Sequence, residues 1–365
     1  MNNQERREKA LHLFARLGEA HGAPGYENAV RSIFREELSE NLQTDKTGNV
    51  ICEKGGIAKS PRILLAAHMD EVGFTVQSIT KDGLIKFVPL GSWSPNTLLA
   101  QRVRVLTQSG VEIIGVIGAK PPHMLVKDER DRVVPLDEMS VDVGAGSRDE
   151  AEGRFGINLG DSIVPYSPFT PMHDPDFLMC KAFDDRVGLA LEIQAIQEMK
   201  KIDHPNTIFA VGTVQEEVGA RGAQTAAPHV NPDAAIVLEC SPADDLPGIS
   251  EDERQGVLGK GVQIRLFDPT ALMNRQFVQF VLGLAKEKHI PHQVSVRKKG
   301  GTDAKAIHLS GTGVPTIVLG IPARYIHTHN SIIHMNDYLS GIELIMELLP
   351  RLNKDMVESF TAFLG

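Results

Sequence analysis

The chain is poor in several features that would each indicate a particular class of protein. It has 3 cysteines in 365 residues, namely Cys52, Cys180 and Cys240. An odd number without zinc-finger spacing argues against a disulfide scaffold. No run approaches the ~20 apolar residues that span a bilayer, and the charged, amphipathic N-terminus lacks the apolar core of a signal peptide. We therefore expect no membrane partner and a cytoplasmic location.

Positive charge is also scarce. The chain has 38 Lys and Arg against 47 Asp and Glu, which gives a net charge of -9, and no basic stripe is visible. This balance argues against a nucleic-acid partner. A hydrophobic content of 42% with 23% charged residues is ordinary for a soluble globular protein. The length predicts roughly two domains.

The pattern of apolar residues changes twice along the chain. Helical spacing at 4–20 and 26–39 is followed by short strand-like runs at 49–53 and 62–67. From Val72 to about Thr170 the apolar runs are short and separated by Gly and Pro, which predicts a small all-β module with one brief helix at 147–153. From Asp184 onward we expect helices at 184–200, 271–288 and 337–349, the last interrupted by Pro350, and strands at 206–214, 234–239, 292–296 and 314–319.

Alternation of helix and strand implies an α/β fold with a mostly parallel central sheet covered by helices on both faces. We therefore predict a discontinuous catalytic α/β domain made of residues 1–72 and 172–365. The inserted small all-β domain would comprise residues 73–171.

Five acid and imidazole side chains lie at the edges of apolar runs: His68, Asp184, Glu217, Glu239 and His327. Strand ends on one edge of an open α/β sheet are where such folds place their chemistry. Two histidines and three carboxylates suit zinc, cobalt or manganese, with one carboxylate free to bridge two ions. The set therefore predicts two divalent ions per subunit, which would generate a hydrolytic nucleophile at neutral pH without Ser or Cys.

Two of these motifs allow a simpler structural interpretation. His68 could bind a metal while Asp70, two residues on, accepts a hydrogen bond from its other ring nitrogen; a polar strand-to-loop junction would look the same. Of the adjacent Asp184 and Asp185, one could cap the helix that follows, which leaves the other free to bridge metals.

Glu216 and Glu217 are the strongest local signal. Adjacent carboxylates at the end of an apolar strand repel each other and resist burial unless a cation is present. Their side chains diverge in extended backbone, so Glu217 can bind metal while Glu216 acts as general base. A solvated loop after the strand is the alternative.

The remaining candidates are less specific. Glu239 is preferred to its neighbour Cys240, which we expect to be a buried thiol, because alternate strand residues face opposite sides. Three late histidines, His327, His329 and His334, could each bind metal. The Gly300–Ala304 segment could line a pocket, or it could cap the helix that follows through Thr302 or Asp303.

In this order and spacing, the segments HMDEVGF, KAFDDRVG, VQEEVGARGAQTA, IVLE, GGTDA and RYIHT resemble the tetrahedral or glutamyl aminopeptidase family of two-metal exopeptidases. The opening segments HGAPGYE and TDKTGNVI resemble it too, so the likeness covers nearly the whole chain. The position of the insertion, between Asp70 and Asp184, also follows the aminopeptidases, since related carboxypeptidases and aminoacylases insert their extra domain before the last histidine.

The resemblance implies a role for each residue. Asp184 would bridge both metals, Glu217 and His327 would complete one site, and His68 and Glu239 the other. Glu216 matches the catalytic carboxylate and Asp70 the residue that supports His68. Among the late histidines, His327 alone follows the Arg-Tyr-x-His pattern. The chain departs from the family at Glu239, where Asp is more common, and at Pro24, where Ser is common.

The resemblance therefore implies a metal-dependent aminopeptidase that acts on short peptides, with zinc or cobalt preferred and manganese possible. A deacylase of N-acyl amino acids with the same metal core and a non-catalytic metal-binding protein are the alternatives. Dimers built through the inserted domain would close into a twelve-subunit shell. The preferred N-terminal residue is open; positive charges that could select acidic residues occur at Arg221, Lys260, Arg265, Lys298 and Lys299.

Overall fold

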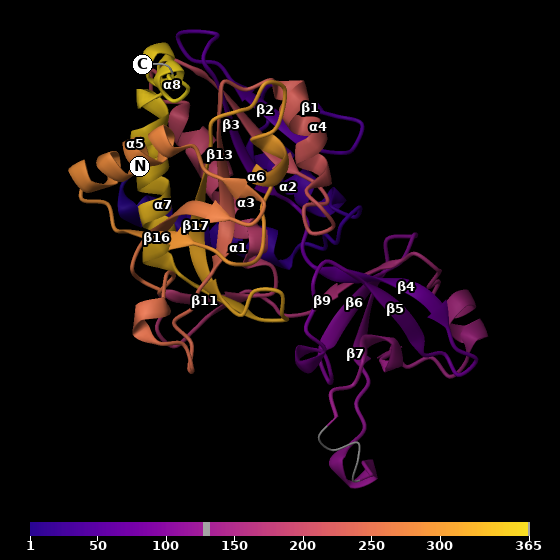
Figure 1. Cartoon of the computed structure of the whole chain (residues 1–365). Coiled ribbons are helices and arrows are strands. Elements are labelled where there is room, and N and C mark those ends of the chain that lie inside the picture. The colour runs from indigo at the N-terminus through magenta and orange to yellow at the C-terminus, as the bar shows by residue number, and fades with distance from the viewer. Residues whose placement is uncertain (127–131, 364–365) are drawn as a thin grey trace.

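The computed structural model describes residues 1–126 and 132–363. It shows an α/β body and a β-barrel that stands to one side of it (Figure 1). Residues 127–131 of the predicted inserted domain and residues 364–365 of the predicted catalytic domain lie outside the described part. None of the helices in that part combines the length and the apolar character needed to cross a bilayer.

The body is built on a mixed sheet whose main path runs β1-β2-β12-β3-β13-β17-β18-β11-β10. Its centre is parallel, as predicted: β12 pairs with β3, β3 with β13, and β13 with β17. The flanking strands are mostly antiparallel, and β14 pairs with β17 beside the main path and carries β15 and β16. The strands are β1 Leu42–Thr44, β2 Val50–Lys54, β3 Arg62–His68, β10 Thr170–Pro171, β11 Phe177–Cys180, β12 Thr207–Thr213, β13 Ala234–Pro242, β14 Val262–Asp268, β15 Ala271–Leu272, β16 His292–Val296, β17 Thr316–Arg324 and β18 Ser331–His334.

Helices cover the sheet because its central strands have no polar face. All seven residues of β12 are buried, and all but the first of β3, which is the pattern of strands covered on both faces. Helix α3 packs against β3 and β13, and α1 and α7 pack against α3. Helix α4 packs against β12 and α6 against β17. The helices are α1 Asn3–Glu19, α2 Asn28–Glu37, α3 Phe183–Met199, α4 Arg221–Val230, α5 Arg275–Glu287, α6 Ala304–Ile307, α7 Met335–Leu348 and α8 Lys354–Ser359.

The inserted module is a closed barrel with the strand order β4-β5-β8-β7-β6-β9. Its strands are β4 Gly73–Ile79, β5 Ile85–Leu90, β6 Arg102–Leu106, β7 Glu112–Ile117, β8 Val141–Asp142 and β9 Ser162–Pro165. It has its own apolar core, in which Phe74 contacts the rings of Phe87 and Trp93. The α/β class with an inserted all-β module is therefore confirmed.

Several element boundaries differ from the sequence prediction. Helix α5 begins at Arg275 and not at 271, because Ala271 and Leu272 form a short strand and the Asn274 side chain caps the helix by accepting the Phe277 N–H at 2.9 Å. The brief helix predicted at 147–153 is a single π-helical turn at Glu150–Arg154. Helix α7 ends at Leu348, just before Pro350, as predicted.

Candidate metal centre and substrate pocket

The candidate site lies at the carboxyl edge of the parallel strands. Strand β3 ends at His68, which is in register with Thr213 at the end of β12. Strand β13 carries Glu239 opposite Gly320 of β17, and β17 leads into the loop that holds His327. Because parallel strands share one carboxyl edge, these distant segments meet there.

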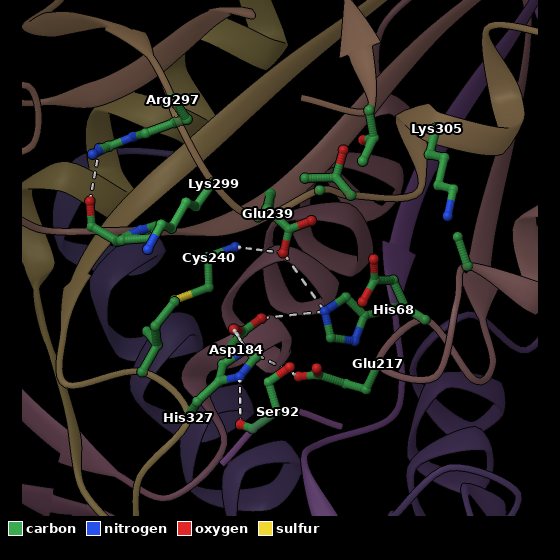
Figure 2. A pocket seen from close by; sticks show the side chains of 18 of the residues that line it. His68, Ser92, Asp184, Glu217, Glu239, Cys240, Arg297, Lys299, Lys305 and His327 are labelled. Atoms are coloured by element: carbon green, nitrogen blue, oxygen red, sulfur yellow. Dashed lines mark hydrogen bonds and ion pairs between the residues drawn. The ribbon is translucent and has the colours of Figure 1, made fainter. Parts of the chain in front are cut away.

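Asp184 lies between the two imidazoles (Figure 2). Its Oδ1 is 3.2 Å from His68 Nε2 and its Oδ2 is 3.3 Å from His327 Nε2. Glu239 Oε1 is 3.6 Å from His68 Nε2, and Glu217 Oε1 is 3.5 Å from His327 Nε2. The structure thus brings all five predicted ligands together, as two groups of three that share Asp184.

Asp185 faces a different environment from Asp184. Its carboxylate accepts the Gly188 N–H at 3.1 Å in the first turn of α3 and the His68 N–H at 3.3 Å. One aspartate of the pair therefore stabilises the helix start, and the other faces the histidines.

The hydrogen-bond partners of the Nδ1 atoms show which nitrogen of each imidazole carries a proton. His68 Nδ1 lies 3.0 Å from the backbone oxygen of Asp70, and His327 Nδ1 lies 2.9 Å from that of Ser92. A carbonyl can only accept, so Nδ1 carries the proton in both rings. Each Nε2 lone pair then faces carboxylate oxygens, an arrangement that requires either a second proton or a cation between them.

The charges of the cluster also favour a bound cation. Although burial opposes the charged ring, the Asp184 and Glu217 carboxylates raise the pKa of His327 to about 10. Burial, reinforced by Asp184, raises the pKa of Glu217 to about 8, and burial raises that of Glu239. Buried carboxylates of this kind are stabilised by bound cations. The donor set and its electrostatics therefore fit a pair of divalent ions.

Asp70 contacts the loop that carries the two glutamates. Its Oδ1 accepts the Glu216 N–H at 2.9 Å and its Oδ2 accepts the Glu217 N–H at 3.1 Å. The same carboxylate is 3.6 Å from His68 Nδ1, farther than the backbone oxygen. The sequence predicted that the Asp70 side chain supports His68. In the structure the Asp70 carboxylate lies closer to the N–H groups of this loop than to the His68 ring.

A cavity of about 290 Å³ opens beside the cluster, and Glu216 lines it together with the metal-ligand candidates. Burial raises the pKa of Glu216. His68 lowers this pKa, whereas the neighbouring carboxylates of Asp303, Glu239 and Glu217 raise it further. A carboxylate that holds a proton readily and faces the cavity has the properties of a general base.

Four basic residues line the rest of the cavity. Two are paired: Arg297 Nη1 with Asp244 at 2.8 Å, and Arg265 Nη1 with Asp268 at 3.2 Å. The side-chain ammonium groups of Lys299 and Lys305 make no hydrogen bond or ion pair with the described part of the chain. Both are labelled in Figure 2, Lys299 to the left of Glu239 and Lys305 to its right in that view. Of the five positive charges considered from the sequence, the cavity contains Arg265 and Lys299.

The surroundings of the remaining sequence candidates show whether each of them faces the site. His329 is buried against the Trp93 ring and His334 lies on the Phe177 ring, so neither faces the cluster. Cys240 is buried, as predicted, and also lines the cavity. Gly300, Gly301 and Thr302 line it as well, while Thr302 Oγ1 accepts the Ala304 N–H at the start of α6. This segment thus combines the two roles that the sequence left open.

Sequence reasoning missed Ser92, Arg297 and Lys305. Ser92 contributes a backbone oxygen to His327, so its side chain gave no signal. Arg297 and Lys305 flank the Lys298–Gly301 stretch, and their positive charges were the available signal.

Known proteins resemble this chain in both sequence and fold. The lysyl aminopeptidase of Pyrococcus furiosus is 35% identical over 352 residues, which cover 93% of this chain and 96% of that protein. The crystal structure of the TET aminopeptidase from the marine sediment archaeon Thaumarchaeota archaeon SCGC AB-539-E09 matches with a TM-score of 0.93 and 43% identity, covering 97% of this chain and 99% of that one. The TET1 peptidase of Pyrococcus horikoshii, which can assemble into a tetrahedron or a large octahedral shell, matches with a TM-score of 0.84 and 29% identity over 94% of this chain and 100% of that one.

The family profile described as M42 glutamyl aminopeptidase matches residues 48–344, which include every candidate ligand and both candidate catalytic carboxylates. The chain therefore belongs to the M42 glutamyl aminopeptidase family of peptide hydrolases.

Proposed function

We propose that the chain is a metal-dependent aminopeptidase that removes N-terminal residues from short peptides. The observation that carries this proposal is the position of Asp184, whose two carboxylate oxygens face the Nε2 atoms of two imidazoles. Asp184 would bridge two divalent ions, with His68 and Glu239 on one and Glu217 and His327 on the other. Zinc or cobalt suits these nitrogen and oxygen ligands best, and manganese is compatible.

Glu216 is the residue of this chain that moves protons. When bound, the ions supply Lewis-acid chemistry, which lowers the pKa of a water molecule and polarises a carbonyl. The Glu216 carboxylate accepts a proton from the attacking water and delivers it to the nitrogen of the departing amine. Asp70 contributes by holding the backbone of Glu216 and Glu217.

The cavity favours an acidic N-terminal side chain. Its two arginines are neutralised by Asp244 and Asp268, whereas Lys299 and Lys305 keep their charges available within the described structure. A glutamate or aspartate side chain entering the cavity would find two ammonium groups, while a lysine side chain would be repelled. We infer a preference for acidic residues, in contrast to the Pyrococcus furiosus relative, whose name specifies lysine.

Assembly follows from the relatives. The likeness to the Pyrococcus horikoshii TET1 peptidase supports a homo-oligomer. We propose dimers that form through the barrel module of residues 73–171 and close into a twelve-subunit shell, which would restrict access to short or unfolded peptides. The mass of the particle in solution tests this: a fully active monomer would contradict it.

The proposed activity is tested with metal-free protein reloaded with Zn²⁺, Co²⁺ or Mn²⁺. We expect no turnover after chelation, recovery on addition of about two equivalents of metal, and hydrolysis of aminoacyl anilides but not of N-acetylated amino acids. Faster cleavage of the N-acetylated substrates would make the protein a deacylase instead. Absence of turnover with every metal and both substrate types would refute an enzymatic role.

A further inference from the structure

The N–H groups of the loop after β12 are held by side chains from other parts of the chain, while its carbonyl oxygens accept the backbone N–H groups of residues 219–222. Four successive backbone N–H groups follow the end of the strand, and each donates to a side-chain oxygen. The bonds are Val214 N–H to Asn49 Oδ1 at 3.0 Å, Gln215 N–H to Glu27 Oε1 at 3.2 Å, Glu216 N–H to Asp70 Oδ1 at 2.9 Å and Glu217 N–H to Asp70 Oδ2 at 3.1 Å. The backbone of the two functional glutamates is thus fixed from outside the strand.

This support is needed because of the conformation of the loop. Gln215 has a φ of 56°, in the left-handed region that residues with a side chain avoid. Such a conformation persists only where its surroundings stabilise it, and it recurs at functional sites. Three buried acceptors, on Asn49, Glu27 and Asp70, provide that stabilisation, and carboxylate acceptors form the stronger hydrogen bonds.

Glu27 is the member of this set that contacts Gln215, the loop residue with the left-handed φ. It is 2% exposed and occupies the position before α2, yet its side chain does not cap that helix. Its Oε1 instead accepts the Gly25 N–H at 2.8 Å and the Gln215 N–H. It is absent from the cavity wall and from both ligand groups. Its contact with Gln215 is therefore its direct hydrogen bond to the loop that carries Glu216.

We propose that Glu27 is a positioning residue for the hydrolytic reaction, which holds the Gln215 amide and so places the Glu216 carboxylate at the cavity. The inference rests on the proposed function, because it takes Glu216 as the general base. This proposal also gives a role to the HGAPGYE segment, which contributes no ligand candidate to the metal cluster. Glu27 is the last residue of that segment and accepts a hydrogen bond from the loop that carries Glu216.

The test compares three variants at Glu27. Glu27→Ala removes the acceptor, and we expect kcat to fall by about 10- to 100-fold while KM changes little and two metal equivalents stay bound. Glu27→Gln keeps an acceptor oxygen and should retain most of the activity. Glu27→Asp keeps the charge but shortens the reach, so it should show the same selective loss of kcat and provides the result if Glu27→Ala does not fold.

Backbone hydrogen exchange gives a readout that is independent of activity. In metal-free protein, Glu27→Ala should accelerate exchange in peptides that span Val214–Val218, because the Gln215 amide loses its acceptor. Asp161→Ala is the matched control: this buried carboxylate accepts the Asn158 N–H at 2.7 Å in the barrel module and does not line the cavity. It should leave both kcat and exchange in 214–218 unchanged.

The outcomes separate this inference from the proposed function. An active wild type with an unchanged kcat in Glu27→Ala, or an equal loss in Asp161→Ala, would overturn the role of Glu27 alone. A wild type that hydrolyses no aminoacyl substrate after metal loading would overturn the proposed function and this inference together.

Discussion

The Asp70 carboxylate accepts the backbone N–H of Glu216 at 2.9 Å and, through its other oxygen, that of Glu217 at 3.1 Å. One side chain from the end of β3 thereby sets the positions of both a candidate base and a candidate metal ligand. The His68 ring is held mainly by the backbone oxygen of Asp70, at 3.0 Å from Nδ1, since the carboxylate lies farther away at 3.6 Å.

Asp70→Asn should therefore impair the loop more than the metal site. An asparagine amide offers one acceptor oxygen and presents an NH₂ group to the second backbone N–H, so one hydrogen bond becomes a donor-donor contact. We expect kcat to fall about 10- to 100-fold while both ions remain bound. Turnover and metal content, measured on the same preparation, check this. Loss of the metal held by His68 would show instead that the carboxylate orients the ring.

Glu216 and Glu217 should respond differently to the same chemical change. Glu216→Gln removes the proton acceptor but no ligand, so we expect turnover to fall about 10²- to 10⁴-fold with both metals retained. Glu217→Gln weakens the site that includes His327, so it should lower metal content as well as turnover. Metal analysis alongside kinetics distinguishes the two. Substantial hydrolysis by Glu216→Gln would remove that residue from the mechanism.

The parts of the fold that local pattern determines were predicted correctly. Strands β3, β12 and β13 are continuous apolar runs, and each was placed within three residues of its observed ends. Strand β14 was missed because its Gln263 and Arg265 are buried polar residues. They are stabilised by distant partners, Arg297 for Gln263 and Ser241 for Arg265, which no local pattern reveals.

In the site, too, some features could be predicted from the sequence and others could not. Its five ligand candidates are recognisable from their residue types and motifs, and the family they indicated is confirmed. What orients them is not recognisable, because the oxygen that fixes His327 belongs to the backbone of Ser92, more than 200 positions earlier in the chain. Likewise, sequence cannot tell that Arg265 is neutralised by Asp268 while Lys299 is available. The contact of Ser92 with His327 is long-range, and although Arg265 and Asp268 lie only three positions apart, their pairing is visible only in the folded chain.

A buried histidine at the junction with the barrel module should make stability depend on pH. Burial, with the nearby Lys181, Arg104 and Arg186, lowers the pKa of His21 to about 3, and its Nε2 lies 2.5 Å from Ser162 Oγ. The unfolded chain takes up a proton near pH 6.5 and the folded chain does not. The stability from neutral His21 is thus fully present above pH 6.5 and is lost as pH falls towards 3.

The His21→Gln variant isolates this contribution. Between pH 6 and pH 4, we expect the unfolding free energy of the wild type to fall relative to the variant by about 1.4 kcal/mol per pH unit. Urea unfolding at several pH values measures the difference, in which contributions of other groups cancel. His173→Gln, at an exposed histidine, should run parallel to the wild type. Parallel curves for His21→Gln too would mean that His21 is protonated in the folded protein.

Substrate preference should follow the charge at position 299. Lys299 lines the cavity, whereas its neighbour Lys298, which is exposed like Lys299, does not. Lys299→Glu should lower kcat/KM for glutamyl anilide about tenfold or more, because a charged hydrogen bond is replaced by repulsion, and should raise kcat/KM for lysyl anilide. Leucyl anilide, with no charge to sense, should change least. Lys298→Glu makes the same charge change one residue away and should leave the ranking of all three substrates intact. If both variants shift the ranking equally, the overall potential of this surface selects the substrate, and a direct contact with Lys299 is excluded.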